Sequence, residues 1–287
     1  MPELPEVEVV KRSLENHIVN QKLKKVKINN NKLRYKIRID HLKKIIGYRV
    51  ESISRRSKYL LFNFENNFTM LVHLGMTGKF FIKENNSLLK KTSFYYSTNS
   101  KIKKHDHVEF EFKRKKLIYN DVRRFGFIKI LCTKKLLEIN HLNILGPEPL
   151  SDTFDNKYFS KKIKNNKRIL KNLLMDQKFI SGLGNIYVNE ILFLSRINPN
   201  RQVMQLKTKE IKTIINNTKI ILKKSIKFGG SSIKNFNDSD GSNGSFQQNF
   251  KVYSRSGKRC MRSKCYGLVR KIVISNRSTF FCNICQK

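Results

Sequence analysis

The sequence predicts an α+β protein with several domains, in which an antiparallel β-sandwich precedes a helical domain and a short C-terminal β-hairpin. Three observations predict this order. Between about residues 22 and 131, short apolar runs alternate with polar residues and are separated by turn-forming residues, as in paired strands. Beyond residue 150 the apolar residues recur at helical spacing. Four of the five cysteines then crowd into residues 260–285.

The first predicted element is an amphipathic helix over residues 6–18. Val7, Val10, Leu14 and Ile18 recur at the spacing that puts them on one helical face. A single apolar face suits a helix that packs against a larger core. We therefore expect this helix to be attached to the β-sandwich that follows it.

Alternating patterns indicate two strand pairs inside the predicted sandwich. Residues 108–112 alternate apolar and polar positions, 113–116 form a polar turn, and 117–119 resume the apolar pattern. Residues 71–72 and 80–82 are expected to form another pair, joined by a glycine-bearing loop. These patterns favour a sandwich, with a closed barrel as the alternative.

Gly-Pro-Glu-Pro at 146–149 indicates a domain boundary, and helical patterns follow it. The last helix should end at Gly229–Gly230, and residues 235–249 are polar and rich in Gly and Ser, as in a mobile loop. The predicted helices span residues 155–164, 167–176, 186–195 and 208–228. The chain accordingly divides into residues 1–133, a linker at 134–150, residues 151–250 and residues 251–287.

The chain is strongly basic, with 60 Lys and Arg against 21 Asp and Glu and a formal net charge of +39. Such an excess favours a polyanionic partner such as nucleic acid, because neutralised phosphates release counterions. Lys, Asn and Ile are abundant together, so AT-rich codons are an alternative source of the charge. The apolar runs are short, and the start is acidic where an export signal would be basic, so we expect a cytoplasmic, nucleoid-associated protein with no membrane partner.

The terminal cysteines form two close pairs, Cys260-x4-Cys265 and Cys282-x2-Cys285. In a cytosolic chain such pairs indicate a metal site rather than disulfides. Two thiolate pairs around a β-hairpin match a structural zinc ribbon, and a hairpin this small needs the metal to fold. An iron–sulfur centre is the alternative use of these thiolates. The first pair has a longer spacing than the usual CxxC, which leaves the ligand role of Cys260 open.

The chain starts with Met1-Pro2-Glu3, and aminopeptidases remove Met before a small residue. The free secondary amine of Pro2 would then have a pKa of about 8, so part of it is uncharged at neutral pH. Such an amine can attack a sugar C1′ and form a cationic iminium, while the Glu3 carboxyl passes a proton to the ring oxygen. The simpler interpretation is that Pro2 reflects only the removal of Met1.

The sequence resembles the formamidopyrimidine-DNA glycosylase family over nearly its full length. The motifs that carry the resemblance are MPELPEVE (1–8), RRSKYLL (55–61), HLGMTG (73–78), KHDHVEF (104–110), DVRRFG (121–126), LGPEPL (145–150), LMDQK (174–178), GLGNIYVNE (182–190), SDG (239–241) and RSTFFCNICQK (277–287). They follow in the family's order. The resemblance implies a catalytic sandwich, a helix–two-turn–helix DNA-binding domain at 151–250 with a lesion loop, and a zinc finger at 251–287.

The resemblance also implies the catalytic residues. Pro2 matches the family's Schiff-base nucleophile and Glu3 its proton donor. Lys58 matches the lysine that assists β-elimination, although without the motif a solvated surface lysine would be the default interpretation. Arg277 matches the arginine assigned to δ-elimination. On physical grounds a guanidinium suits a phosphate clamp better than an acid.

Met76, Arg123 and Phe125 match the side chains that fill the gap left by an everted nucleotide. Arg123 would also donate to the cytosine opposite the lesion. Core packing is the alternative for Met76 and Phe125, and their glycine-bearing loops weaken it. His105, Lys171 and Asn185 match phosphate contacts, of which Asn185 opens a helix whose N-terminus suits an anion. Residues 238–246 align with the loop that folds over an everted 8-oxoguanine.

Three features depart from the family's pattern. Val122 replaces the usual proline of the DPRRFG motif. Asn166 stands where the family has a lysine, so Lys167 or Lys164 would take over that contact. About a dozen extra residues lie between 84 and 102, as in an enlarged outer loop.

The resulting prediction is a monomeric bifunctional glycosylase and abasic-site lyase that binds damaged double-stranded DNA and holds one structural zinc ion. It would excise an oxidised purine and then cleave the strand by β- and δ-elimination in base excision repair. One rival is a sister enzyme of the same fold that prefers oxidised pyrimidines. Another is a catalytically silent zinc-ribbon protein that binds damage, which would not need a free Pro2 amine.

Overall fold

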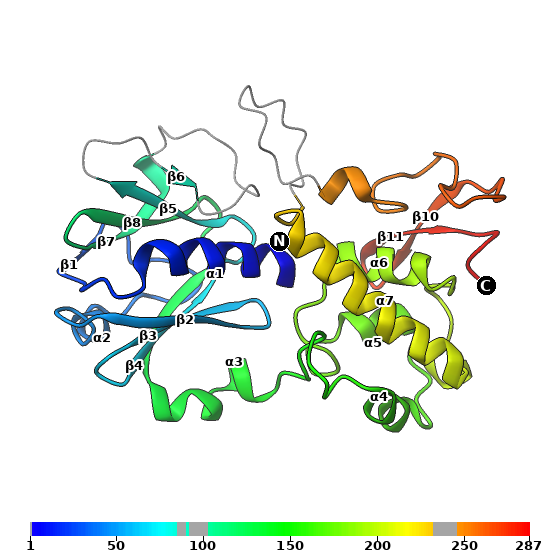
Figure 1. Ribbon diagram of the computed structural model, residues 1–287, viewed down its shortest axis with the longest axis horizontal. Helices are drawn as coiled ribbons and strands as arrows, with labels where there is room; N and C mark the ends of the chain where they lie inside the picture. The colour runs from blue at the N-terminus through cyan, green and yellow to red at the C-terminus, as the bar shows by residue number, and fades with distance from the viewer. Residues whose placement is uncertain (1, 85–89, 92–102, 232–245) are drawn as a thin grey trace. The chain divides into compact units, whose positions relative to one another are not determined.

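The computed structural model describes residues 2–84, 90–91, 103–231 and 246–287 (Figure 1). The chain forms two compact units, Met1–Asn143 with Phe228–Ser245, and Ile144–Lys227 with Phe246–Lys287. This division is coarser than the four segments expected from the sequence, whose boundaries stay a prediction. Within the described ranges, no helix combines the length and the apolar character that a bilayer-spanning segment requires.

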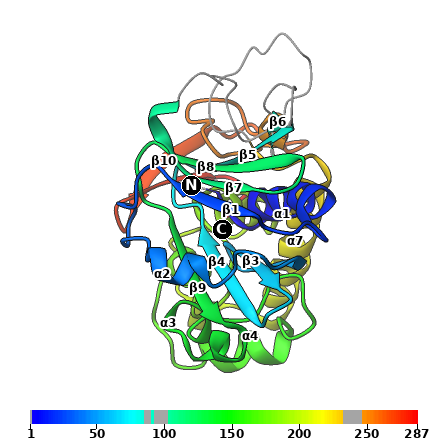
Figure 2. The ribbon, with the colours of Figure 1, turned by 90° about the vertical axis from the view of Figure 1, so that its left-hand side faces the viewer.

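The first unit is built on two antiparallel sheets. Its strands are β1 (Lys25–Ile28), β2 (Val50–Arg56), β3 (Tyr59–Phe64), β4 (Phe68–His73), β5 (Gly78–Glu84), β6 (Lys90–Lys91), β7 (Asp106–Glu111), β8 (Lys115–Asp121) and β9 (Phe127–Cys132). One sheet has the order β1-β7-β8-β5-β6 and the other β2-β3-β4-β9 (Figures 1 and 2). Phe62 and Phe80, one from each sheet, meet in the shared core with ring centroids 5.8 Å apart. The predicted sandwich is therefore confirmed.

The N-terminal helix of this unit is α1 (Leu4–Ile18), which confirms the predicted helix and starts slightly earlier. Val7, Val10, Leu14 and Ile18 are buried as their spacing predicts, and they join the core between the sheets. The helix lies along the edge of the sandwich, against β2 and β3 (Figure 1). The shorter helices of the unit are α2 (Ile39–Lys43), η1 (Lys103–His105), η2 (Thr133–Glu138) and α3 (Asn140–Asn143).

One predicted strand pairing is wrong. The runs at 71–72 and 80–82 lie in β4 and β5, and these strands belong to different sheets. β4 pairs with β3 and β9, whereas β5 pairs with β8 and β6. Gly75, at φ = +59°, helps to redirect the chain between the two sheets. Local alternation predicts a strand but not its partner, because pairing is decided by distant segments. The pairing of β7 with β8 is as predicted.

The second unit contains the helical domain and the C-terminal hairpin. Its elements are α4 (Asn156–Ile163), α5 (Leu170–Met175), α6 (Asn185–Leu194), η3 (Val203–Gln205), α7 (Thr208–Lys227), η4 (Phe246–Asn249), β10 (Val269–Ile274) and β11 (Arg277–Cys282). Each predicted helix is present. α5 starts at Leu170, later than expected, because Ile169 is extended and bridges to Gln202. α6 packs against α5, α7 and β11, and so joins the helical core to the hairpin (Figure 1).

Candidate functional site

Pro2 and Glu3 are buried immediately before α1. Glu3 is the N-cap residue of the helix and is only 3% exposed. The Glu6 carboxylate accepts the Glu3 backbone N–H at 2.9 Å, in a capping box that satisfies the first turn. The backbone at the start of the chain is thereby held in one conformation, with a carboxyl group beside Pro2.

Glu6 also binds the last residue described before 232–245. Its Oε1 accepts the Ser231 backbone N–H at 2.8 Å and the Ser231 hydroxyl at 2.9 Å. The sequence-based site residues did not include Glu6, although the spacing of Glu3 and Glu6 is a capping-box signal. The expected lesion loop at 238–246 lies outside the described residues, apart from Phe246.

Lys58 lies in the tight turn between β2 and β3 and is 6% exposed. This burial does not fit the default interpretation of a solvated surface lysine. Burial first, and then the positive charge of Lys58, lower the pKa of His73 on β4 to about 4. His73 is therefore neutral at pH 7, and its Nδ1 accepts the Gly75 N–H at 3.0 Å. The loop that carries Met76 thus begins beside the charge of Lys58.

Met76, Arg123 and Phe125 come together at the surface of the first unit. Met76 is 38% and Phe125 is 45% exposed, so neither belongs to the core. The Arg123 Nη1 lies 3.1 Å from the Met76 sulfur, and the guanidinium carbon lies 4.5 Å from the Phe125 ring centroid. Two segments far apart in the sequence therefore present one exposed cluster with an apolar, a cationic and an aromatic member.

Asp121 holds together the two loops that carry this cluster. It is fully buried at the end of β8, and its carboxylate accepts the Thr77 hydroxyl and, at 2.8 Å, the Gly126 N–H. The Thr77 oxygen in turn accepts the Arg123 N–H at 3.0 Å. A Cβ on Gly75 would lie 2.5 Å from the Gly126 nitrogen, so only glycine allows the loops to approach this closely.

We expect Asp121→Asn to lower the free energy of unfolding by about 1–3 kcal/mol, because an amide NH₂ would face one of these donors in a buried place. The measurement is urea unfolding of both proteins. Asp40→Asn is the matched control, since Asp40 pairs with Arg38 on the surface. An Asp121→Asn protein with the same urea midpoint as the control would contradict the stabilising role of the Asp121 carboxylate between the two loops.

In the second unit, Lys171, Asn185 and Arg277 converge on the start of β11. Lys171 is fully buried, and its ammonium donates to the Thr279 hydroxyl at 2.6 Å and to the Ser278 carbonyl at 3.2 Å. The Asn185 amide donates to the same carbonyl at 2.9 Å. Burial and then the positive charge of Arg277 lower the pKa of Lys171 to about 8. Arg277 itself is exposed beside the hairpin turn.

The other predicted DNA contacts lie apart from these groups. His105 is half-buried at the end of η1, directly before β7, and Lys167 is exposed between α4 and α5. Asn166 closes the turn before Lys167 and Arg168, because its side-chain oxygen accepts the Arg168 N–H at 2.9 Å. The DNA-binding roles of His105, Lys167 and Lys171 stay predictions.

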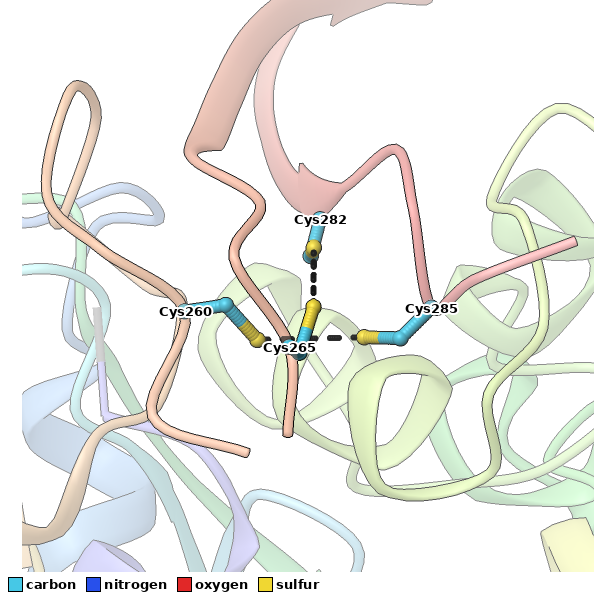
Figure 3. Close-up of side chains that lie close together, drawn as sticks. All are labelled: Cys260, Cys265, Cys282 and Cys285. Atoms are coloured by element: carbon cyan, nitrogen blue, oxygen red, sulfur yellow. Dashed lines mark hydrogen bonds between the residues drawn. The ribbon is translucent and has the colours of Figure 1, made fainter. Parts of the chain in front are cut away.

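The four terminal cysteines form one cluster (Figure 3). Their sulfur atoms all lie within 4.8 Å of one another, with 3.8 Å between Cys260 and Cys285 and 3.7 Å between Cys265 and Cys282. A tetrahedral ion with metal–sulfur bonds of about 2.3 Å needs sulfurs about 3.8 Å apart, so the spacing fits a metal ion. The longer first spacing does not move Cys260 away from the other three.

Glu190 on α6 anchors the segment that leads to the cysteine cluster. Its carboxylate accepts three consecutive backbone N–H groups, those of Lys251 at 2.9 Å, Val252 at 3.0 Å and Tyr253 at 2.8 Å. Burial raises the pKa of Glu190, and these three hydrogen bonds oppose the rise. The sequence-based site residues did not include Glu190, because its partners lie about 60 residues away and form no local pattern.

Two family models match the chain. The N-terminal domain model of formamidopyrimidine-DNA glycosylase covers residues 1–128, and the H2TH domain model of the same enzyme covers residues 145–237. A curated protein named formamidopyrimidine-DNA glycosylase, from Rickettsia bellii, is 41% identical and is covered in full, as is this chain.

Solved structures show the same similarity. A complex between the Lactococcus lactis Fpg and an abasic-site-containing DNA matches at a TM-score of 0.85 with 36% identity, covering 99% of each chain. A Lactococcus lactis FPG mutant in complex with a Fapy-dG-containing DNA matches at a TM-score of 0.85 with 35% identity, covering each chain completely.

Proposed function

Because the chain belongs to the formamidopyrimidine-DNA glycosylase family, we propose that it excises oxidised purines from duplex DNA and then cleaves the strand at the same nucleotide. The proposed target bases are 8-oxoguanine and formamidopyrimidines. The observation that carries this proposal is the full-length similarity to relatives named for formamidopyrimidine. The buried Pro2-Glu3 start adds a nucleophile and a proton donor side by side.

The chemistry begins at the Pro2 amine, once Met1 has been removed. The amine attacks C1′ of the damaged nucleotide, the bond from C1′ to the base breaks, and the base leaves with a proton. Glu3 protonates the sugar ring oxygen and opens the ring. The product is a cationic iminium between Pro2 and C1′. Loss of a C2′ proton then expels the 3′ phosphate, and loss of the C4′ proton expels the 5′ phosphate.

The cations would bind the phosphates around the lesion. Lys58 is the proposed partner of the phosphate beside the damaged nucleotide and helps β-elimination, while Arg277 clamps a phosphate during δ-elimination. Asn185, His105 and Lys167 would hold further phosphates, whereas Lys171, buried against Ser278 and Thr279, would support the strand that carries Arg277. Phosphate contacts made by lysines and arginines would account for part of the net charge of +39. We also propose that the protein acts as a monomer on the DNA of the cytoplasm.

Met76, Arg123 and Phe125 would fill the space that the everted nucleotide leaves. Base eversion costs a few kcal/mol of lost stacking and pairing, so a wedge that occupies the gap stabilises the open duplex. Their exposure and mutual contacts support this role, and the hydrogen bonds of Asp121 join the two loops that carry them. Arg123 adds donors for the cytosine opposite the lesion.

Zinc is the proposed metal of the four-cysteine cluster, because Cys260, Cys265, Cys282 and Cys285 supply thiolates at the spacing of a tetrahedral site. Bound there, zinc would hold the hairpin that carries Arg277 in its folded form. It has no part in the proposed bond-breaking steps.

The proposal is tested by incubating the protein with duplexes that contain 8-oxoguanine opposite cytosine, or thymine glycol, with borohydride in parallel. We expect faster excision of 8-oxoguanine, a one-nucleotide gap with phosphate ends, and a covalent complex that borohydride traps. Faster excision of thymine glycol would favour the pyrimidine-specific sister enzyme. Normal trapping by a Pro2→Gly protein, or full activity with Met1 retained in the mass spectrum, would contradict the mechanism.

A further inference from the structure

The guanidinium of Arg55 connects α1 with the turn that carries Lys58. Its Nε donates to the Glu8 carboxylate at 2.9 Å, and its Nη1 donates to the Ser57 carbonyl at 2.8 Å. We propose that Arg55 is a positioning residue that sets the place of Lys58 for strand cleavage, and that Glu8 holds Arg55 for this task. This inference rests on the proposed function.

A hydrogen bond to the Ser57 carbonyl constrains the backbone conformation of the turn that carries Lys58. Ser57 is 1% exposed, so its backbone groups need partners inside the protein. Its φ of +56° is a left-handed conformation that a residue with a side chain adopts only when its surroundings impose it. The Ser57 carbonyl belongs to the peptide that joins Ser57 to Lys58. Fixing this carbonyl therefore fixes the direction in which the Lys58 side chain leaves the backbone.

Glu8 makes the connection to the start of the chain. It lies on the same helix that begins directly after Pro2 and Glu3, about 7.5 Å along the axis from Glu3. The Glu8 and Arg55 side chains are 15% and 10% exposed, so solvent screens their ion pair little. Burial by itself would raise the pKa of Glu8, but the hydrogen bonds from Arg55 and Arg12 and the charges of Arg55 and Lys11 lower it, so Glu8 is ionised at neutral pH.

The contacts of Arg55 with Glu8 and with the Ser57 carbonyl require a guanidinium. Its planar fork presents N–H groups in two directions and reaches both the carboxylate and the carbonyl, whereas a lysine ammonium is a single point on a flexible stem. Arg12 provides an internal comparison. It donates to the other oxygen of Glu8 at 3.0 Å, but its side chain is 61% exposed and it lies four residues after Glu8 on the same helix.

The test uses Arg55→Lys, Glu8→Gln and the matched control Arg12→Gln in the full chain, with single-turnover cleavage of a duplex that contains an abasic site. We expect Arg55→Lys to slow strand cleavage by about 10-fold to 100-fold, because a small misplacement of a reacting group has effects of this size. Glu8→Gln should give a smaller loss, and Arg12→Gln should cleave at the wild-type rate. Unfolding midpoints are measured for each protein.

The decisive measurement repeats Arg55→Lys and Glu8→Gln in a Lys58→Ala background. If Arg55 acts through Lys58, neither change slows cleavage further once Lys58 is absent. A general structural role would produce the same fold-loss in both backgrounds and would overturn the inference, as would wild-type rates for both variants. Should Arg55→Lys fail to fold, Glu8→Gln and Lys58→Ala still form a double-mutant cycle that makes the same test. A wild-type protein that leaves the abasic duplex intact would overturn the proposed function as well.

Discussion

Glu3→Gln is expected to slow base excision by about 10²-fold to 10⁴-fold, the range over which a positioned proton donor contributes to a reaction. Glutamine has nearly the same size as glutamate, and its amide oxygen can still cap the first turn of α1. It cannot transfer a proton to the sugar ring oxygen. The fold should therefore persist while the chemistry is lost, which separates the proton-transfer role of Glu3 from its capping role.

The measurement is single-turnover excision of 8-oxoguanine, accompanied by duplex binding and the unfolding midpoint. Glu15→Gln is the matched control, because Glu15 lies on the same helix and pairs only with Lys11 among its charged neighbours in the described residues. We expect both proteins to bind the damaged duplex as the wild type does. A Glu3→Gln protein that excises within a few-fold of the wild-type rate would remove Glu3 from the mechanism.

Cys282→Ser is expected to abolish stoichiometric zinc binding and to unfold the C-terminal hairpin. A structural zinc site contributes about 10–16 kcal/mol of binding energy to a small domain of this kind, far more than a two-stranded hairpin gains by itself. Cys282 is fully buried at the end of β11, and a Cβ on Gly267 would lie 2.7 Å from its sulfur. The backbone is therefore tightly packed around this sulfur. Because Arg277 opens the same strand, duplex affinity should fall by at least about 10-fold.

Metal analysis and duplex binding measure these effects. Cys132→Ser is the matched control, since Cys132 ends β9 in the first unit and lies outside the cluster. A Cys282→Ser protein with one zinc ion per chain and full affinity would contradict the site. Iron in place of zinc in the purified protein would instead support the iron–sulfur alternative. Cys260→Ser tests whether the fourth thiolate is a ligand, and we expect it to lose zinc as well.

The local patterns of the chain predicted most of the elements correctly. The helix at Leu4–Ile18, the four helices after residue 150 and the hairpin between the cysteine pairs all follow from apolar spacing, capping residues and turn signals. These features depend on neighbours a few residues apart, so a single sequence contains them. The glycine-bearing loops around Met76 and Phe125 likewise indicated exposure, and both side chains are exposed.

The contacts that join distant segments could not be predicted in this way. The two loops of the exposed cluster meet through Asp121, Thr77 and Gly126, and the three amides bound by Glu190 follow it by about 60 residues. Arg55 reaches Glu8 across 47 residues. A buried carboxylate has no characteristic neighbours in the sequence, because its partners are chosen by the packing of whole elements.

By itself, the order of amino acids predicted the family, the clustering of four cysteines and the secondary structure of most segments. Only the tertiary structure decided that β4 and β5 enter different sheets and that Lys58 is buried beside His73. It also decided that Asp121, Glu190 and Arg55 make hydrogen bonds to segments distant in the sequence or to the turn before Lys58. The physical reason is the separation, along the sequence, of the residues that interact. Helical spacing and turn chemistry depend on residues a few positions apart. Strand pairing and buried hydrogen bonds instead depend on how segments distant in the sequence pack against one another and exclude water.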